Sequence, residues 1–143
     1  MSTFSDMAVG AGLWGETLTY LTYLKPDETV RLDASVLGEL YLELGEAGAQ
    51  NVVTRAMEDL TQRLTDADQM YRDGDFLDLR KTVRATVAVA EQIGMRSLAR
   101  CAQDVVACID AGDPVALAAV LARLMRIGER SLNAVWDLQG LSI

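Results

Sequence analysis

The longest regular pattern in the chain is a seam of apolar residues between about Gly48 and Tyr71, spaced alternately four and three positions apart. Its members are Val53, Met57, Leu60, Leu64, Ala67 and Tyr71. An α-helix completes a turn every 3.6 residues, so this spacing places them all on one side of a helix. A long amphipathic helix is therefore predicted. A shorter stretch before it has the same period, from a potential N-cap at Asp33 to a break at Gly45, and predicts a short helix. Its apolar positions are Val36, Leu37, Leu40, Tyr41 and Leu44.

A third helix is predicted after the turn at Asp73-Gly74-Asp75, where Asp75 can act as the N-cap. Gly94 is placed to end it, because glycine readily adopts the left-handed conformation that follows many helices. The apolar stripe between them consists of Phe76, Leu79, Val83, Thr86, Ala90 and Ile93.

Two more amphipathic stretches follow. Ser97 is the expected N-cap of the fourth helix, and Gly112 ends it. Asp113-Pro114 is a strong start signal for the last helix, with Asp as N-cap and Pro as the first helical residue. The fourth stripe is Leu98, Cys101, Ala102, Val105 and Ile109; the last is Leu117, Val120, Leu121, Leu124, Ile127, Leu132, Val135 and Trp136.

These elements predict an all-α fold. Four amphipathic helices joined by short turns are typical of an up-and-down four-helix bundle, here over residues 31–143, with the helix after Asp33 as a short lid. Residues 1–30 form an extra N-terminal segment. Helix and strand templates fit residues 16–24 about equally. We favour a helix packed on the bundle, with Trp14, Tyr20 and Tyr23 as padding or as a dimer contact.

The chain of 143 residues carries a net charge of −8, which disfavours general binding of nucleic acids because phosphate backbones are also negative. No apolar run approaches the ~20 residues that cross a bilayer. The first residues lack the positive region of a signal peptide. A cytoplasmic protein that binds neither nucleic acid nor membrane is expected.

Residues for catalysis are scarce. The chain has no histidine, and Cys101 and Cys108 lie two helical turns apart, too far for a disulfide, so reduced structural thiols are expected. Helical carboxylates are present at Glu39, Glu43, Glu58, Asp59 and Glu91, but di-metal sites in bundles usually include a Glu-x-x-His motif. No Gly-rich phosphate loop or Ser-His-Asp set occurs. We therefore predict no enzyme activity, no cofactor and no metal.

Four short segments, in order, resemble those of the histidine-containing phosphotransfer (Hpt) domain family over Arg31 to about Leu138. They are Leu32-Asp33-Ala34-Ser35-Val36-Leu37-Gly38-Glu39-Leu40, Tyr71-Arg72-Asp73-Gly74-Asp75-Phe76-Leu77-Asp78-Leu79, Gln92-Ile93-Gly94-Met95-Arg96-Ser97-Leu98 and Cys108-Ile109-Asp110-Ala111-Gly112-Asp113. The second is similar to the entry into the family's active helix and the third to its exit. The resemblance implies an Hpt-like bundle in two-component signalling.

The family's phosphorylation motif, H-x-L-K-G, lies on that active helix, with the phospho-accepting histidine ten residues before the exit glycine. Counting back from Gly94 places Arg84 at the histidine position, Val87 at the lysine position and Ala88 at the small glycine position. A guanidinium remains protonated at neutral pH and cannot act as the nucleophilic imidazole does. The resemblance therefore implies a degenerate member that carries no phosphate.

Without phosphate transfer, the resemblance still implies a docking face for a response-regulator receiver or a histidine kinase. The residues assigned to it are Arg80, Lys81, Arg84, Val87, Ala88 and Glu91, with Arg96 and Arg100 flanking from the next helix. Arg84 would face the carboxylates of a receiver's phosphoacceptor pocket. Alternatively, this is an ordinary solvated face whose arginines pair with Glu91 or Asp78. A third interpretation is a structural homodimer formed through the N-terminal segment and Trp136.

Overall fold

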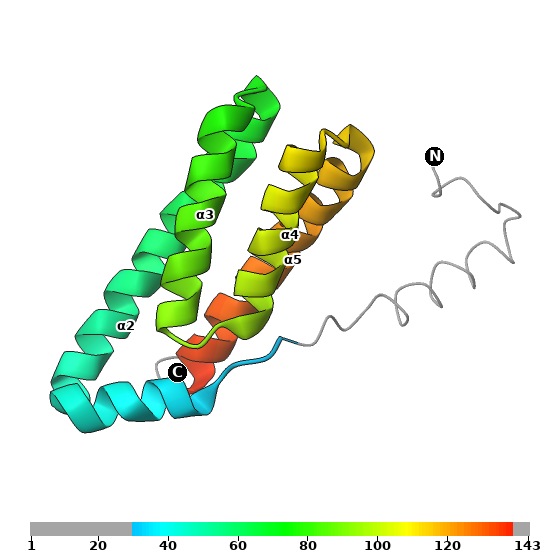
Figure 1. Cartoon of the computed structure of the whole chain (residues 1–143). Helices are drawn as coiled ribbons and strands as arrows, with labels where there is room; N and C mark the ends of the chain where they lie inside the picture. Colours follow the sequence, from blue (N-terminus) through cyan, green and yellow to red (C-terminus); the bar gives the residue numbers. More distant parts are fainter. Residues whose placement is uncertain (1–29, 139–143) are drawn as a thin grey trace, which may run out of the picture.

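The computed structural model describes residues 30–138, which form four helices (Figure 1). They are α2 (Ala34–Asp73), α3 (Phe76–Gln92), α4 (Arg96–Ala111) and α5 (Pro114–Leu138). Between residues 30 and 138 the only β-type pairing is an isolated antiparallel bridge between Leu32 and Met95. The prediction of an all-α protein is confirmed. The predicted packing of the N-terminal segment falls on residues 1–29, outside the described residues.

The helix α2 bends sharply at Gly45, whose φ of 76° and ψ of 174° are not helical. The predicted break at Gly45 is therefore confirmed, but the helix resumes at once rather than near Gly48. In Figure 1 the part before Gly45 crosses the lower end of the bundle, and the longer part rises beside α3. Leu44 lies at the bend and is 47% exposed, although it continues the apolar stripe of the preceding residues.

Side-chain caps start three of the helices as predicted. The Asp33 carboxylate accepts from the Ser35 amide, Asp75 from the Asp78 amide at 3.3 Å and Asp113 from the Ala116 amide at 3.1 Å. The predicted cap at Ser97 is wrong, because α4 already begins at Arg96. The Ser97 hydroxyl instead accepts a hydrogen bond of 2.7 Å from the Arg31 amide.

Residues 31–33 are bonded to the turn between α3 and α4, and we call this pairing the backbone clip. The Asp33 amide donates to the Gly94 carbonyl at 2.7 Å, and the Arg96 amide donates to the Arg31 carbonyl at 3.1 Å. The clip thus satisfies an amide at the start of α4 that has no partner within the helix. It also joins the start of the described chain to the middle of the sequence.

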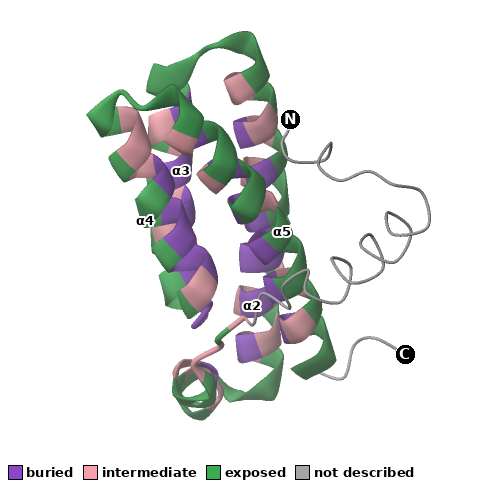
Figure 2. Cartoon of the chain, turned by 90° about the vertical axis from the view of Figure 1, so that its right-hand side faces the viewer, coloured by how far each residue is buried: buried purple, intermediate pink, exposed green. Residues whose placement is uncertain are grey.

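The apolar stripes of the four helices meet in one core, seen in Figure 2 as buried faces turned inward. The largest side chains that are completely enclosed are Leu60, Leu79, Ile93, Met95, Leu98 and Leu124. Two predicted stripe residues are exceptions: Phe76 is 44% exposed and Trp136 is 40% exposed. Both lie near the end of a helix, where fewer neighbours cover them, and the Phe76 ring rests 6.1 Å from that of Tyr71.

The contact between α2 and α5 is close at one point. A methyl group added at Gly128 would lie 2.5 Å from Leu64 Cδ1, so the Leu64 side chain packs where α5 has no side chain. Cys101 and Cys108 do not form a disulfide with each other, and the buried Cys101 thiol donates to the Val120 carbonyl at 3.8 Å. These contacts fix the rigid frame on which α3 presents its outer face.

Candidate functional site

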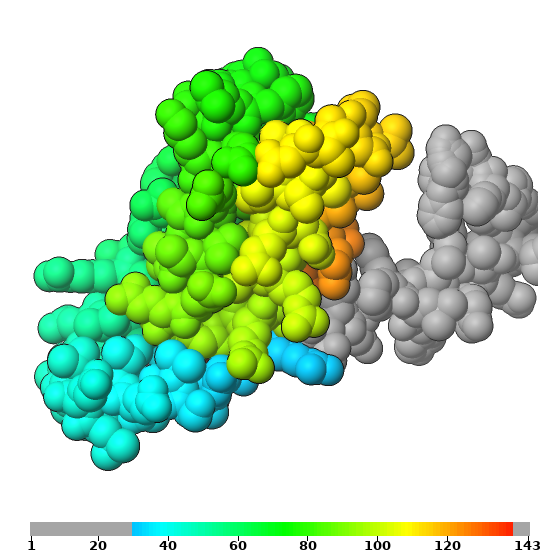
Figure 3. Space-filling view, viewed as in Figure 1, coloured from blue at the N-terminus to red at the C-terminus, as the bar shows by residue number. Residues whose placement is uncertain are grey.

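Four of the six residues predicted for docking lie together along the outer side of α3. Arg84, Val87, Ala88 and Glu91 line a groove of about 440 Å³ between α3 and α4. The other wall comes from α4 and consists of Gln103, Val106, Ala107 and Asp110. We call this feature the α3–α4 groove; Figure 3 shows the face of the molecule that α3 and α4 form.

The groove has an apolar floor and polar ends. Val87 and Val106 are partly exposed, and Ala88 and Ala107 are exposed, so hydrocarbon is open to solvent in its middle. Arg84 and Asp110 stand at one end, and Glu91 and Gln103 at the other. None of these eight side chains is a nucleophile of the kind used in covalent catalysis, apart from the carboxylates. The arrangement is suited to binding another surface.

The sequence analysis assigned Arg80 to a docking face, but its side chain is already bound within the molecule. Its guanidinium binds Asp110 of α4 through two parallel hydrogen bonds, Nε to Oδ1 at 2.7 Å and Nη2 to Oδ2 at 3.0 Å. Its partner is therefore on the neighbouring helix, and not Asp78 or Glu91 of its own helix, the alternative that the sequence left open for this face. The hydrogen bond from Arg80 is the main cause that lowers the pKa of Asp110, and the positive charges of Arg80 and Arg84 lower it further.

Arg84 remains exposed, one turn along α3 from Arg80. Within the described residues it has neither a hydrogen bond nor an ion pair at bonding distance. Its charge still acts on Asp110, whose pKa it helps to lower. Arg84 is thus a cation at the mouth of an apolar groove, held in place by the helix rather than by a partner side chain.

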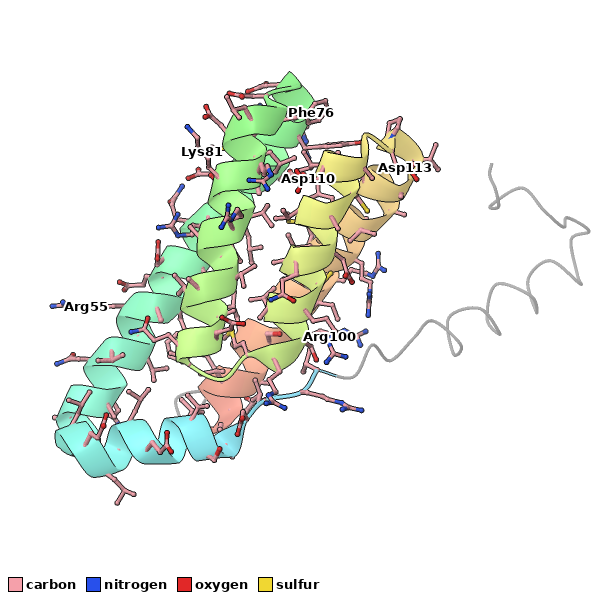
Figure 4. The ribbon with its side chains drawn as sticks, viewed as in Figure 1. Arg55, Phe76, Lys81, Arg100, Asp110 and Asp113 are labelled. Atoms are coloured by element: carbon pink, nitrogen blue, oxygen red, sulfur yellow. The ribbon has the colours of Figure 1, made fainter. Side chains whose placement is uncertain are left out.

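Lys81 lies apart from these residues. Figure 4 shows its side chain pointing away from α4, on the flank of α3 that faces outward beyond the groove. It does not line the groove.

Arg96 and Arg100 lie at the far end of α4 from Asp110. With Asp33, Val36, Gly94 and Ala99 they line a second pocket of about 360 Å³, which shares Glu91 and Gln103 with the α3–α4 groove. They do not flank Arg80, as was predicted, because α4 runs antiparallel to α3. Arg96 Nε lies 3.4 Å from Asp33 Oδ2. The pKa of Asp33 is lowered, chiefly by the hydrogen bond from the Ser35 hydroxyl, and less by Arg96.

Charge is distributed unevenly over the helices. Eight acidic and three basic side chains lie on α2, whereas α3 and α4 together have five basic and four acidic ones. The helix α5 carries three basic and two acidic side chains, so the acidic excess of the helices is confined to α2. A negatively charged partner is therefore disfavoured on α2.

Several other classes of site are absent from residues 30–138. No three His, Cys, Asp or Glu side chains there are grouped closely enough to hold a metal ion. In the same part of the chain, no helix has the length and apolarity needed to cross a bilayer. The chain matches no protein-family model, no curated protein and no solved structure in the three comparisons made.

Proposed function

We propose that the chain is a non-catalytic, Hpt-like signalling module that binds a receiver domain or a histidine kinase in the cytoplasm and modulates phosphotransfer without carrying phosphate. The observation that carries this proposal is the position of Arg84. It stands ten residues before Gly94, where the resemblance puts the phospho-accepting histidine, and it is exposed at the end of an apolar groove.

The chemistry of Arg84 suits docking. A guanidinium forms charge-assisted hydrogen bonds with carboxylates and phosphoryl groups, which a receiver's acidic pocket would supply. The small side chains of Ala88 and Ala107 leave room for a partner helix to approach the floor. The part of α2 before Gly45 would serve as the lid of an Hpt-like bundle, packed on the turn at Gly94 through Val36.

Calorimetric titration against the receiver domains of the source organism tests this function. We expect micromolar or tighter binding to at least one receiver, weakened about tenfold or more by Arg84→Ala, because a charged hydrogen bond contributes roughly 1.5–3 kcal/mol. Arg55→Ala is the matched control: Arg55 projects from α2, away from α3 and α4 (Figure 4). Binding to no receiver or kinase, or equal losses for both variants, would overturn the proposal.

A phosphotransfer assay tests whether the chain modulates phosphotransfer without carrying phosphate. With a cognate kinase, a receiver and labelled ATP, we expect no label on this chain and slower transfer between the other two proteins. Acid-labile label on this chain would show a phosphoramidate and refute a non-catalytic role.

A structural homodimer is the second candidate, favoured by apolar exposure at the end of α5. Trp136 is 40% exposed and Leu138 is 56% exposed. Light scattering would give a dimer mass that Trp136→Ala reduces to that of a monomer. A monomer mass at every protein concentration would exclude this candidate.

A further inference from the structure

We propose that two copies of this chain exchange residues 30–44 at high protein concentration. We call these residues the arm; it crosses the lower end of the bundle in Figure 1. In the exchange, α2 straightens at Gly45 and each arm binds the turn between α3 and α4 of the other copy. The inference does not rest on the proposed function, because the outer face of α3 takes no part in it.

The bend that directs the arm depends on one residue. Gly45 is the residue inside α2 whose backbone is not helical, and its φ of 76° and ψ of 174° belong to a region that essentially only glycine occupies. An added Cβ atom would meet nothing within 4 Å, so glycine is needed here for the backbone angles and not for space. Leu44 and Glu46 on either side both favour a helix. Gly45 is therefore a hinge of one residue, and a helical Gly45 would make α2 continuous.

The contacts of the arm can be supplied by a second copy. Leu37 is buried in the core, and Leu32 pairs with Met95, which is completely enclosed. Straightening in one copy alone would pull the arm away and expose these apolar side chains to water, which is unfavourable. When two copies straighten together, each arm takes the place of the other. The contacts of the arm are then made again, and only the hinge differs.

The exchanged form also gains a contact that a single copy lacks. Leu42 and Leu44 lie just before the hinge, and their side chains are 87% and 47% exposed. In a two-fold symmetric pair the two hinges run between the copies in opposite directions, which brings these leucines close to their counterparts. Burial of their apolar surface stabilises the pair. A second copy of this chain is therefore the partner that suits the exposed leucines.

Protein concentration decides between the two forms. In a single copy the hinge tethers the arm to its own bundle, and a short tether gives an effective concentration in the millimolar range. The native chain should therefore exchange only toward millimolar concentration. Alanine at Gly45 is strained in the bend and favours the helix, so each hinge should shift toward the straight form by roughly thirtyfold. Because a pair contains two hinges, its dissociation constant should fall about a thousandfold, into the micromolar range.

Light scattering from micromolar to millimolar concentration measures this shift. We expect the mass of a dimer for Gly45→Ala at a micromolar concentration where the native chain has that of a monomer. Gly38→Ala is the matched control, because Gly38 lies exposed in the arm, an added Cβ atom also meets nothing there, and the hinge is unchanged. Adding Leu42→Gln should weaken the Gly45→Ala dimer severalfold. Leu77→Gln, which removes a leucine that is 68% exposed on α3, should not weaken it.

A disulfide identifies the copy on which each arm lies. Leu32 and Met95 stand opposite each other, and the hydrogen bonds of the backbone clip lie on either side of them. The Cα atoms of such a pair are about 4.5 Å apart, which suits a disulfide. After oxidation of folded Gly45→Ala protein that also carries Leu32→Cys and Met95→Cys, we expect position 32 of one chain to be linked to position 95 of another. With native Gly45 at micromolar concentration, the same bond should form within one chain.

Two outcomes would overturn the proposal: a Gly45→Ala monomer up to millimolar concentration, or a dimer in which positions 32 and 95 are linked only within single chains. If Gly45→Ala does not fold, the cysteine pair with native Gly45 decides the matter. The fraction of linked chains must then rise with protein concentration, and a constant fraction refutes exchange. Trp136→Ala should leave the linked chains unchanged, which separates exchange from a dimer formed through the end of α5. Receiver titrations test the proposed function separately, since they report on the outer face of α3.

Discussion

Three glycines with positive φ angles form the turns of the bundle, and they lie at opposite ends. Gly74 and Gly112, with φ of 75° and 66°, connect helices at the upper end in Figure 1, and Gly94, with φ of 78°, connects α3 and α4 at the lower end. At the upper end a Cβ atom would meet nothing within 4 Å. At the lower end it would lie 2.7 Å from the Asp33 carbonyl oxygen.

A glycine after a helix is thus required for different reasons at the two ends of the bundle. At Gly74 and Gly112, glycine is needed only for the left-handed backbone, as after many helices. At Gly94 it is also needed because residues 31–33 cross over the turn in the backbone clip. The upper end is made of independent turns, whereas the lower end is a single packed unit that joins three parts of the chain.

The largest effect that distinguishes the two ends is expected for Gly94→Ala. A left-handed alanine costs roughly 1–2 kcal/mol at any of the three glycines. At Gly94 the clash with Asp33 O adds to this, and we expect a total loss of roughly 3 kcal/mol or more in the free energy of unfolding. Urea denaturation of Gly94→Ala beside Gly74→Ala measures the difference.

Equal losses for these two variants would show that the backbone clip yields easily and that the comparison between the ends is wrong. Gly112→Ala serves as a second upper-end control, because its added methyl group also meets open space.

Much of the helical frame could be predicted from residues alone. The caps at Asp33, Asp75 and Asp113 and the stops at Gly74, Gly94 and Gly112 rest on bonds within a few residues. Ser97 was misassigned because its partner, Arg31, is 66 residues away, and no local pattern encodes such a bond. Leu44, Phe76 and Trp136 follow the apolar stripes but are exposed, because periodicity gives the side of a helix but not how far its neighbours extend.

The site was predicted on one wall only. Arg84, Val87, Ala88 and Glu91 were named from the resemblance, but their neighbours on α4 were not. Asp110 could have been found from antiparallel register: it lies sixteen residues after Gly94, and Arg80 fourteen before. That symmetry about the turn brings the two charges together. Charge alone does not distinguish the two flanks of α3, so the sequence did not show that Lys81 points away from α4.

A smaller effect is expected for the N-caps, and it should be similar at the two ends. Asp33→Ala and Asp113→Ala each remove a carboxylate that accepts from the first turn of a helix. We expect each to cost about 1 kcal/mol, because capping is a local interaction. Thermal unfolding of both variants checks this. If Asp33→Ala costs far more than Asp113→Ala, the lower end depends on the side chain as well as on the clip backbone.

The smallest expected effects are changes in the pKa values of two aspartates. The pKa values of Asp33 and Asp110 are both lowered by folding, so each contributes stability above its unfolded value near 4 that is lost as the pH falls through the folded pKa. Arg80 is the leading cause for Asp110, whereas Ser35 leads for Asp33. Carboxyl titration by NMR should therefore show a clear upward shift for Asp110 in Arg80→Met, and a smaller one for Asp33 in Arg96→Met.

Comparable shifts in these two titrations, or none for Asp110, would contradict the assignment of causes. Arg55→Met is the matched control, and it should leave both midpoints unchanged because Arg55 projects from α2, away from α3 and α4.

The backbone clip has a consequence for how the protein opens. The amide of Asp33 donates to the Gly94 carbonyl and is protected from solvent exchange while residues 31–33 stay bonded to the turn. Release of the clip needs no separation of the helices, so this amide should exchange through a small local opening, well before those in the centres of α3 and α4. The lower end at Gly94, which tolerates substitution least, would then be the first part of the bundle to open locally. Each opening would break the hydrogen bonds that hold Arg31 against α4.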